Sequence, residues 1–352
     1  MNGFIALFSQ ILEQLRLAAV NVPGLTPLAD APFLFRPLVM VVLLGVVAGV
    51  IGVIINLRSA EFSAEAMVHA VFPGIVAGAV YWGINAIIPA ASVVAVVAAL
   101  VLTIVSHRAR RGEASEAGTA VVLTSFFSIG LILSLAKGDM SGQLEALMFG
   151  RLLEVTDERL AQALIVCAVA LLLIMATWKE QIAYAFDRTG ARASGLRLLA
   201  LDLVLNTAIA AAVVSASTAV GTLLVIGYLV IPGATGRILA SRVRTMVAAA
   251  IAVGVGGGYL GMLLMALPAT LDKPVSPQAT VALVMTGILL LAVGVATARE
   301  RLREATQRAR SVQPATVASP WTEASADGTA GRVGGAEGSA SAAAPVAERS
   351  RV

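Results

Sequence analysis

Charged residues are scarce in this sequence. Of its 352 residues only 13% are charged, whereas 58% are hydrophobic and the mean hydropathy is +0.89. A soluble domain has about a quarter of its residues charged, so the composition excludes that class. Aromatic residues are also few, at 5%, and a chain built largely from Ala, Val, Leu and Gly suits close-packed helices better than a β-barrel wall. We therefore predict an all-α polytopic membrane protein.

Cysteine and histidine are nearly absent. The single cysteine, Cys167, excludes an intramolecular disulfide and a cysteine-based metal cage, and two histidines exclude a dense multi-histidine site within one chain. The sequence also has no Gly-x-x-x-x-Gly-Lys-Ser/Thr phosphate loop and no His-Glu-x-x-His motif. We expect a protein that is not an enzyme in its own right and that binds no nucleotide through such a loop.

Apolar runs separated by short polar loops predict eight to nine transmembrane helices. The count is eight if the runs on either side of Ser215–Ser217 are not two separate spans. The predicted spans lie near residues 36–57, 64–83, 90–106, 119–136, 160–177, 199–216, 218–236, 246–267 and 278–297.

Basic residues cluster in alternate loops and predict the orientation. They lie in residues 107–111, 179–197, 237–244 and 299–310, after the third, fifth, seventh and ninth spans. Basic loops stay on the cytoplasmic side of a bacterial inner membrane, so we expect an outside N-terminus and a cytoplasmic C-terminus. The net charge of +4 is then a sign of orientation, and we expect no nucleic-acid partner.

Three regions follow from these patterns. Residues 1–34 form an amphipathic segment, whose helix over 4–20 is expected to lie along the membrane interface. Residues 35–298 form the transmembrane domain. Residues 299–352 comprise a basic end and an Ala/Ser/Gly-rich tail, which is expected to be disordered because it has too few apolar residues to form a core.

The second predicted span begins with a pair of candidate metal ligands. Glu65 and His69 are four residues apart, so they share one face of a helix. Two ligands are too few for tight chelation, but a symmetric pair of chains would supply two carboxylates and two imidazoles. Alternatively, both residues are ordinary interfacial groups, with the glutamate favoured by the helix dipole.

Proline–glycine pairs interrupt two of the spans. Pro73–Gly74 and Pro232–Gly233 are either bends that line a pathway or ordinary kinks in packed helices. The small-residue pairs Gly45/Gly49 and Gly254/Gly258 predict tight helix contacts.

Two cytoplasmic features remain. Asp202 and Asn206 share a face of the sixth span, where capping or packing is expected in preference to a second ion site. The stretch 185–197 contains a short amphipathic helix that ends at Gly195, which can adopt the left-handed conformation. Such a helix could dock in a groove of a cytoplasmic partner, or it is a simple charged connector.

Five segments together resemble the permease subunits of ABC importers for zinc, manganese and iron, the ABC-3 metal permeases. The resemblance covers residues 35–297. Its segments are Arg58–Gly74, Leu147–Val155, Phe186–Gly195, Val220–Pro232 and Leu271–Pro277.

The resemblance implies a type II-like importer permease that works by alternating access. It implies a homodimer or paired permease, cytoplasmic ABC ATPase subunits that bind the ATP, and an extracytoplasmic metal-binding protein. The divalent ion is the substrate, and no cofactor is bound permanently.

The resemblance also implies site residues. His69 matches the histidine of the family's metal-contacting motif, and Glu65 stands where the family has aspartate. Asp187, Ala191 and Gly195 map onto the helix that couples to the ATPase. A permease for a siderophore or vitamin and a secondary metal-ion transporter remain as alternative functions.

Overall fold

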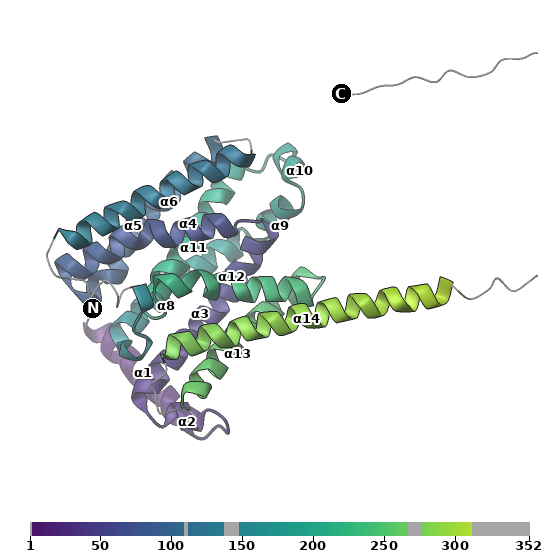
Figure 1. Ribbon diagram of the computed structural model, residues 1–352. Helices are drawn as coiled ribbons and strands as arrows, with labels where there is room; N and C mark the ends of the chain where they lie inside the picture. The colour runs from purple at the N-terminus through teal and green to yellow at the C-terminus, as the bar shows by residue number, and fades with distance from the viewer. Residues whose placement is uncertain (1, 109–111, 137–147, 267–275, 312–352) are drawn as a thin grey trace, which may run out of the picture. The chain divides into compact units, whose positions relative to one another are not determined.

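The computed structural model describes residues 2–108, 112–136, 148–266 and 276–311, which are helical with short connections (Figure 1). In these residues no strand occurs. The helices are α1 (Asn2–Val20), α2 (Thr26–Ala29), α3 (Pro32–Leu57), α4 (Glu61–Ala77), α5 (Ile87–Arg108), α6 (Gly112–Leu135), α8 (Asp157–Ala176), α9 (Trp178–Phe186), α10 (Arg188–Ala193), α11 (Leu198–Ser217), α12 (Thr222–Leu239), α13 (Val243–Ala266) and α14 (Pro277–Ser311).

Eight of these helices are long and apolar enough to cross a membrane: α3, α4 with the π-helical turn that follows it, α5, α6, α8, α11, α13 and α14. The remaining predicted span, 218–236, corresponds to α12, which is apolar but shorter. The predicted start of this helix was wrong by four residues. Residues 218–220 form a turn, and Gly221 has a φ of +86°, so the helix begins only at Thr222. The all-α membrane architecture is confirmed.

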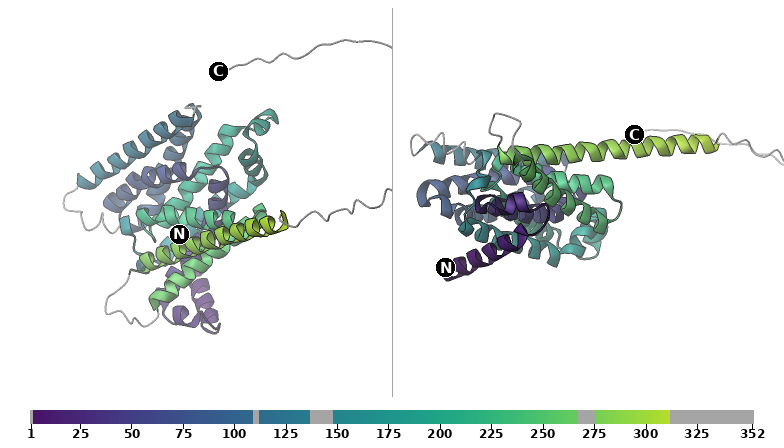
Figure 2. Two further views of the ribbon diagram at one scale, coloured as in Figure 1. Left: turned by 45° about the vertical axis from the view of Figure 1, so that its right-hand side comes forward. Right: turned by 90° about the horizontal axis from the view of Figure 1, so that it is seen from below.

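Residues 1–301 form one compact unit in which α3 is the central helix. It packs against α13, α12 and α8 along its length, and its two ends reach different partners. Its first turn lies near α2, and its last residues reach α9. Helices α1 and α2 therefore lie at one end of the unit, called the α1 end, and α9 and α10 lie at the other, the α10 end (Figure 2).

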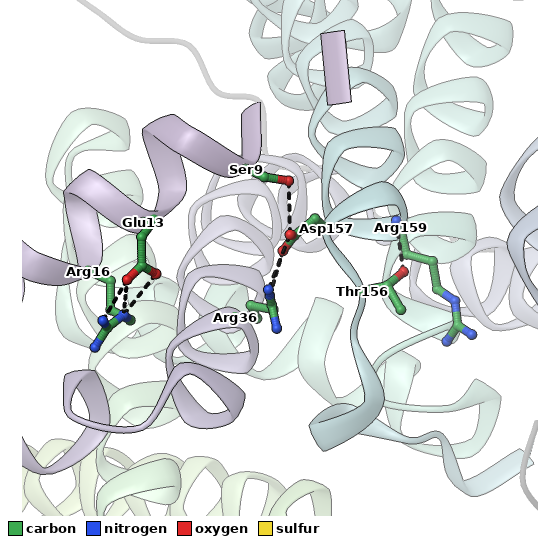
Figure 3. Close-up of polar contacts among 7 residues, drawn as sticks. All are labelled: Ser9, Glu13, Arg16, Arg36, Thr156, Asp157 and Arg159. Atoms are coloured by element: carbon green, nitrogen blue, oxygen red, sulfur yellow. Dashed lines mark hydrogen bonds and ion pairs between the residues drawn. The ribbon is translucent and has the colours of Figure 1, made fainter. Parts of the chain in front are cut away.

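The N-terminal amphipathic helix exists, and polar contacts attach it to the spans. Asp157, the first residue of α8, accepts hydrogen bonds from Ser9 Oγ at 2.9 Å and from Arg36 Nε at 2.5 Å (Figure 3). On the exposed side of α1, Arg16 Nη2 lies 2.6 Å from Glu13 Oε1 and holds the pKa of that carboxyl below its usual value. Leu12 on the apolar side is buried near α3 and α8, whereas Ile11 and Leu15 on that side are exposed. An interfacial position for α1 stays a prediction.

Helix α3 begins at Pro32, so the predicted boundary between residues 34 and 35 falls inside this helix. A proline fits the first helical turn, where its missing N–H has no helical partner. At the other end, α14 continues past the predicted span end at 297 to Ser311, through residues such as Ala, Arg, Glu and Leu that favour helix. The tail predicted as disordered, residues 311–352, lies outside the described residues except for Ser311, which is the last residue of α14, and most of the Leu271–Pro277 motif lies outside them as well.

Small residues let α3 and α13 approach each other closely, as the glycine spacing predicts. A Cβ atom on Gly45 would lie 2.6 Å from the backbone of Gly254, and one on Gly49 would lie 2.7 Å from Ile251. The two predicted glycine pairs thus face each other across one helix contact. Tyr228 of α12 lies beside this helix contact, where its buried hydroxyl donates a hydrogen bond to the Val41 carbonyl of α3 at 2.8 Å.

This contact gives a first prediction. Gly254→Ala places a methyl group against backbone, which cannot move aside as a flexible side chain can, so the free energy of unfolding should fall by about 1–3 kcal/mol. Gly256→Ala, on the same helix, is the matched control, because a Cβ there meets nothing within 4 Å. Thermal unfolding of both purified variants in one detergent measures the difference. Equal midpoints for the two variants would show that the contact is not this tight.

Candidate functional site

Helix α4 carries both predicted ligands, as expected from their spacing. It runs unbroken from Glu61 to Ala77, with Glu65 in its second turn and His69 one turn later. Residues four apart lie on the same face, so the carboxylate and the imidazole point to one side of the helix.

Glu65 is exposed on this chain, although its neighbours are not. Ala64, Ala66 and Met67 are each 0% exposed, because they face the interior of the helix bundle. An ionised carboxylate on a membrane-spanning helix is costly against lipid and normally faces a protein interior or a water-filled path. This face of α4 is therefore one that protein or water covers in the membrane.

His69 is half-buried and is held by an aromatic contact. Its ring lies edge-on to Phe127 of α6, with the ring centroids 5.2 Å apart and the planes at 82°. Phe127 also contacts Phe72, one turn further along α4, at 5.2 Å between centroids. Aromatic packing restricts the imidazole rotamer, which keeps the ring on the face that carries Glu65.

The described residues contain no group of three or more His, Cys, Asp or Glu side chains placed to hold one metal ion. Within this part of a single chain, Glu65 and His69 thus form a two-ligand site at most. Further ligands must complete the usual set around a transition metal.

The two proline–glycine pairs lie in continuous, buried stretches of α4 and α12. A Cβ atom on Gly74 would lie 2.8 Å from Ala91 Cα of α5, and one on Gly233 would lie against the backbone of Gly52 in α3. Both glycines thus serve close helix packing. A role for Pro73, Gly74, Pro232 and Gly233 in lining a pathway stays a prediction.

A polar cavity of about 330 Å³ lies at the α10 end, one turn before Glu65 along α4. Its lining includes Ser63, Glu116, Arg188 and Asn206. The cavity brings the start of α4 together with the end of α5, the start of α6 and the α9–α10 segment. His107 and Arg108 of the first predicted basic stretch therefore lie at the same end of the unit as the second stretch, residues 179–197.

Asp202 and Asn206 have the packing roles that the sequence predicts. Asp202 forms an ion pair with Arg58, and Asn206 Nδ2 donates to Thr103 Oγ1 of α5 at 2.9 Å. Arg58 was not among the residues predicted to have a role. The sequence feature that could have indicated it is its position directly after an apolar run, at the start of the segment that resembles the ABC-3 permeases.

The stretch 185–197 contains the short helix that the sequence predicts, α10. Asp187 is extended and separates α9 from α10, because its side chain caps α10. The carboxylate accepts from the backbone N–H groups of Gly190 at 2.9 Å and Thr189 at 3.0 Å. These hydrogen bonds hold the pKa of Asp187 below its usual value.

Helix α10 ends as predicted at Gly195, whose φ is +80°. The N–H of Leu196 donates to the Ala191 carbonyl at 3.1 Å, and the N–H of Gly195 donates to that of Arg192, also at 3.1 Å. This pair of bonds is a Schellman motif, which stops a helix through a left-handed residue. Ala191 is buried against Tyr184 and Leu198.

Comparison with known proteins identifies the family. The model of the ABC 3 transport family matches residues 30–296. The chain belongs to the ABC 3 transport family.

The chain is similar in sequence to membrane proteins of metal transport systems. It is 32% identical over 231 residues to the manganese transport system membrane protein MntC of Listeria monocytogenes, covering 65% of this chain and 80% of that protein. It is 31% identical over 226 residues to the chelated iron transport system membrane protein YfeC of Yersinia pestis, covering 63% and 75%. The structure of PsaBC from Streptococcus pneumoniae in complex with Fab aligns with a TM-score of 0.65 and 25% identity, over 76% of this chain and 94% of that one.

In this ABC 3 transport family member, two of the five segments that carry the resemblance contact each other. Gly150 and Gly221 both have positive φ, at +77° and +86°, and a Cβ atom on either would collide with the backbone of the other. Gln278 Nε2 of α14 donates to the Gly150 carbonyl at 3.1 Å. The contact explains why glycine stands at both positions.

The Schellman motif gives a second prediction. Gly195→Val forces a β-branched residue into the left-handed region, at a cost of roughly 1–2 kcal/mol. That cost should raise amide hydrogen exchange across α10 by about 5- to 30-fold. Gly195→Asn is the control, since asparagine tolerates this conformation. Mass spectrometry of peptides that cover 188–196 checks it, and equal exchange in the two variants would contradict it.

Proposed function

We propose that the chain is the membrane-spanning subunit of an ATP-driven importer for divalent transition metal ions, with manganese, iron or zinc as the substrate. The names of the relatives support this substrate class, since they are manganese and iron transport proteins. The observation that carries the proposal is the exposed Glu65 beside His69 on a spanning helix. An ionisable side chain on a membrane-spanning helix normally pairs with another group or lies on the path of an ion or substrate.

Two permease chains pair so that their Glu65 faces meet. The pair supplies two carboxylates and two imidazoles, a ligand set that suits manganese, ferrous iron and zinc alike. The ion binds the ionised carboxylate and the neutral imidazole. These ligands replace part of the ion's hydration shell within the membrane. Each chain contributes only two ligands, and separation of the faces therefore releases the ion.

The α10 end faces the cytoplasm of a bacterial cell, and the C-terminus lies on the same side. The basic residues that adjoin this end support the orientation, because basic loops remain cytoplasmic. ATPase subunits on separate chains bind and hydrolyse ATP, and they dock on α10 through the segment that contains Asp187, Ala191 and Gly195. A metal-binding protein delivers the ion to the α1 end from outside.

The ligand pair gives a third prediction. Glu65→Gln or His69→Ala should lower metal uptake by about tenfold or more, because removal of one ligand per chain halves the ligand set. Glu65→Asp keeps the carboxylate and should retain part of the uptake. Glu61→Gln is the matched control, since Glu61 lies on the same helix one turn earlier.

Cellular metal content, measured by elemental mass spectrometry in a deletion strain under metal limitation, checks this prediction. Wild type should restore one metal, Glu61→Gln should do the same, and the ligand variants should not. Full restoration by Glu65→Gln/His69→Ala would show that the site is elsewhere. Restoration of no metal by wild type would favour a siderophore or vitamin as the cargo.

A further inference from the structure

The corner between α3 and α4 is short and rigid. Arg58 N–H closes the last turn of α3 on the Ile54 carbonyl at 3.0 Å, and Ala60 N–H donates to the Ile55 carbonyl at 2.9 Å. Ser59 between them has a φ of +51°, and among the described residues no other non-glycine residue has a positive φ. Helix α4 begins immediately afterwards, so a displacement of Arg58 moves the first turns of α4.

Arg58 is held by three side chains, none of which comes from α3 or α4. Its Nη1 donates to Gln181 Oε1 at 2.6 Å, its Nη2 pairs with Asp202, and its guanidinium carbon lies 3.9 Å from the centroid of the Tyr184 ring. The Arg58 side chain is only 8% exposed. Removing the partners of a buried guanidinium would leave an uncompensated charge in the interior, which strongly destabilises the fold. We therefore expect Arg58 to move together with its partners.

Two of these partners belong to α9, the helix that leads into α10. Gln181 is fully buried, and its Nε2 donates to the Leu201 carbonyl of α11 at 3.0 Å. Tyr184 packs against Ala191 of α10. A series of packed side chains therefore runs from α10 through Tyr184 to Arg58, which lies at the α3–α4 corner.

A cavity that leaves room for movement lies beside these packed side chains. Arg58 and Ser59 line the cavity of about 330 Å³, together with Ser63 of α4 and Arg188 of α10. The corner can shift into this volume without displacing a packed helix. At the opposite end of α3, an apolar cavity of about 340 Å³ lies between Val39 and Leu43 of this helix and the side chains of α1 and α8, and it has no polar lining around Arg36. The small cavity beside Arg36 and Asp157 measures about 20 Å³.

We propose that Arg58 is a positioning residue that transmits movement of α10 to the α3–α4 corner and so to Glu65 and His69. This inference rests on the proposed function, in which an ATPase moves α10. Arg58 itself contacts neither the ion nor the ATPase. Its planar guanidinium pairs with Gln181 and Asp202 while it stacks on Tyr184, a combination that lysine cannot provide.

The test uses the complete transporter in proteoliposomes, with ATP hydrolysis and uptake of manganese measured in the same vesicles. Arg58→Gln and Arg58→Lys should keep ATP hydrolysis within about twofold of wild type. Uptake per ATP should fall by roughly 5- to 150-fold, the usual size of a coupling between two sites. Arg36→Gln is the control, because Arg36 also pairs with an aspartate, at the other end of α3 and with a more exposed side chain. It should leave uptake per ATP unchanged.

A second readout separates this inference from the proposed substrate. Amide hydrogen exchange over residues 61–69, with and without ATP, reports whether α4 responds to the ATPase. Wild type and Arg36→Gln should show an ATP-dependent change, and Arg58→Gln should lose it. If this pattern holds while wild-type vesicles take up no manganese, iron or zinc when each is supplied in turn, Arg58 acts as proposed and the metal assignment fails.

Three results would overturn the role of Arg58. One is an unchanged uptake per ATP in Arg58→Gln. Another is a proportional loss of hydrolysis and uptake, which indicates a merely structural residue. The third is an ATP-dependent exchange change over 61–69 that survives the substitution.

Discussion

A charged side chain within a bilayer needs a polar partner, because no water is available to solvate it. This constraint explains the two ion pairs at the ends of the central helix. Arg36 pairs with Asp157 where α3 begins, and Arg58 pairs with Asp202 where α3 ends. The central helix is thus fixed at both ends by ion pairs to α8 and α11. Against this background the exposure of Glu65, on a helix long and apolar enough to span the membrane, supports the proposed binding face.

Close packing between these fixed ends depends on small residues. The hydrophobic effect does not drive helices together in lipid, so association relies on van der Waals contact at short distances. Gly45 against Gly254 and Gly52 against Gly233 bring α13 and α12 onto α3. The same packing holds α4 through Gly74 on α5. A rigid α3 with neighbours in direct backbone contact is a suitable support for one helix, α4, whose start adjoins a cavity.

Hydropathy predicts the helices, because the period and length of an apolar run are local properties of the sequence. Local chemistry also predicts the end of α10 at Gly195 and the shared face of Glu65 and His69. The partners of Arg58 are a different case, since Gln181 and Asp202 lie 123 and 144 residues away. No pattern in or near the first span indicates which distant groups surround Arg58, the arginine that follows it. The start of α12 was wrong for the same reason. The conformation of Gly221 depends on its contact with Gly150, more than seventy positions earlier in the chain.

The glutamate at position 65 has a geometric consequence for the proposed site. Glutamate has one methylene more than the aspartate that the resemblance leads one to expect, so its carboxylate reaches further from the α4 axis and has one more rotatable bond. His69 is held against Phe127 and has little freedom to adjust. The carboxylate must therefore adapt to the ion, while the imidazole provides the fixed ligand. A site with one adaptable ligand per chain tolerates ions with different preferred geometries. Selection among manganese, iron and zinc would then depend more on which ion is delivered than on this pair of residues.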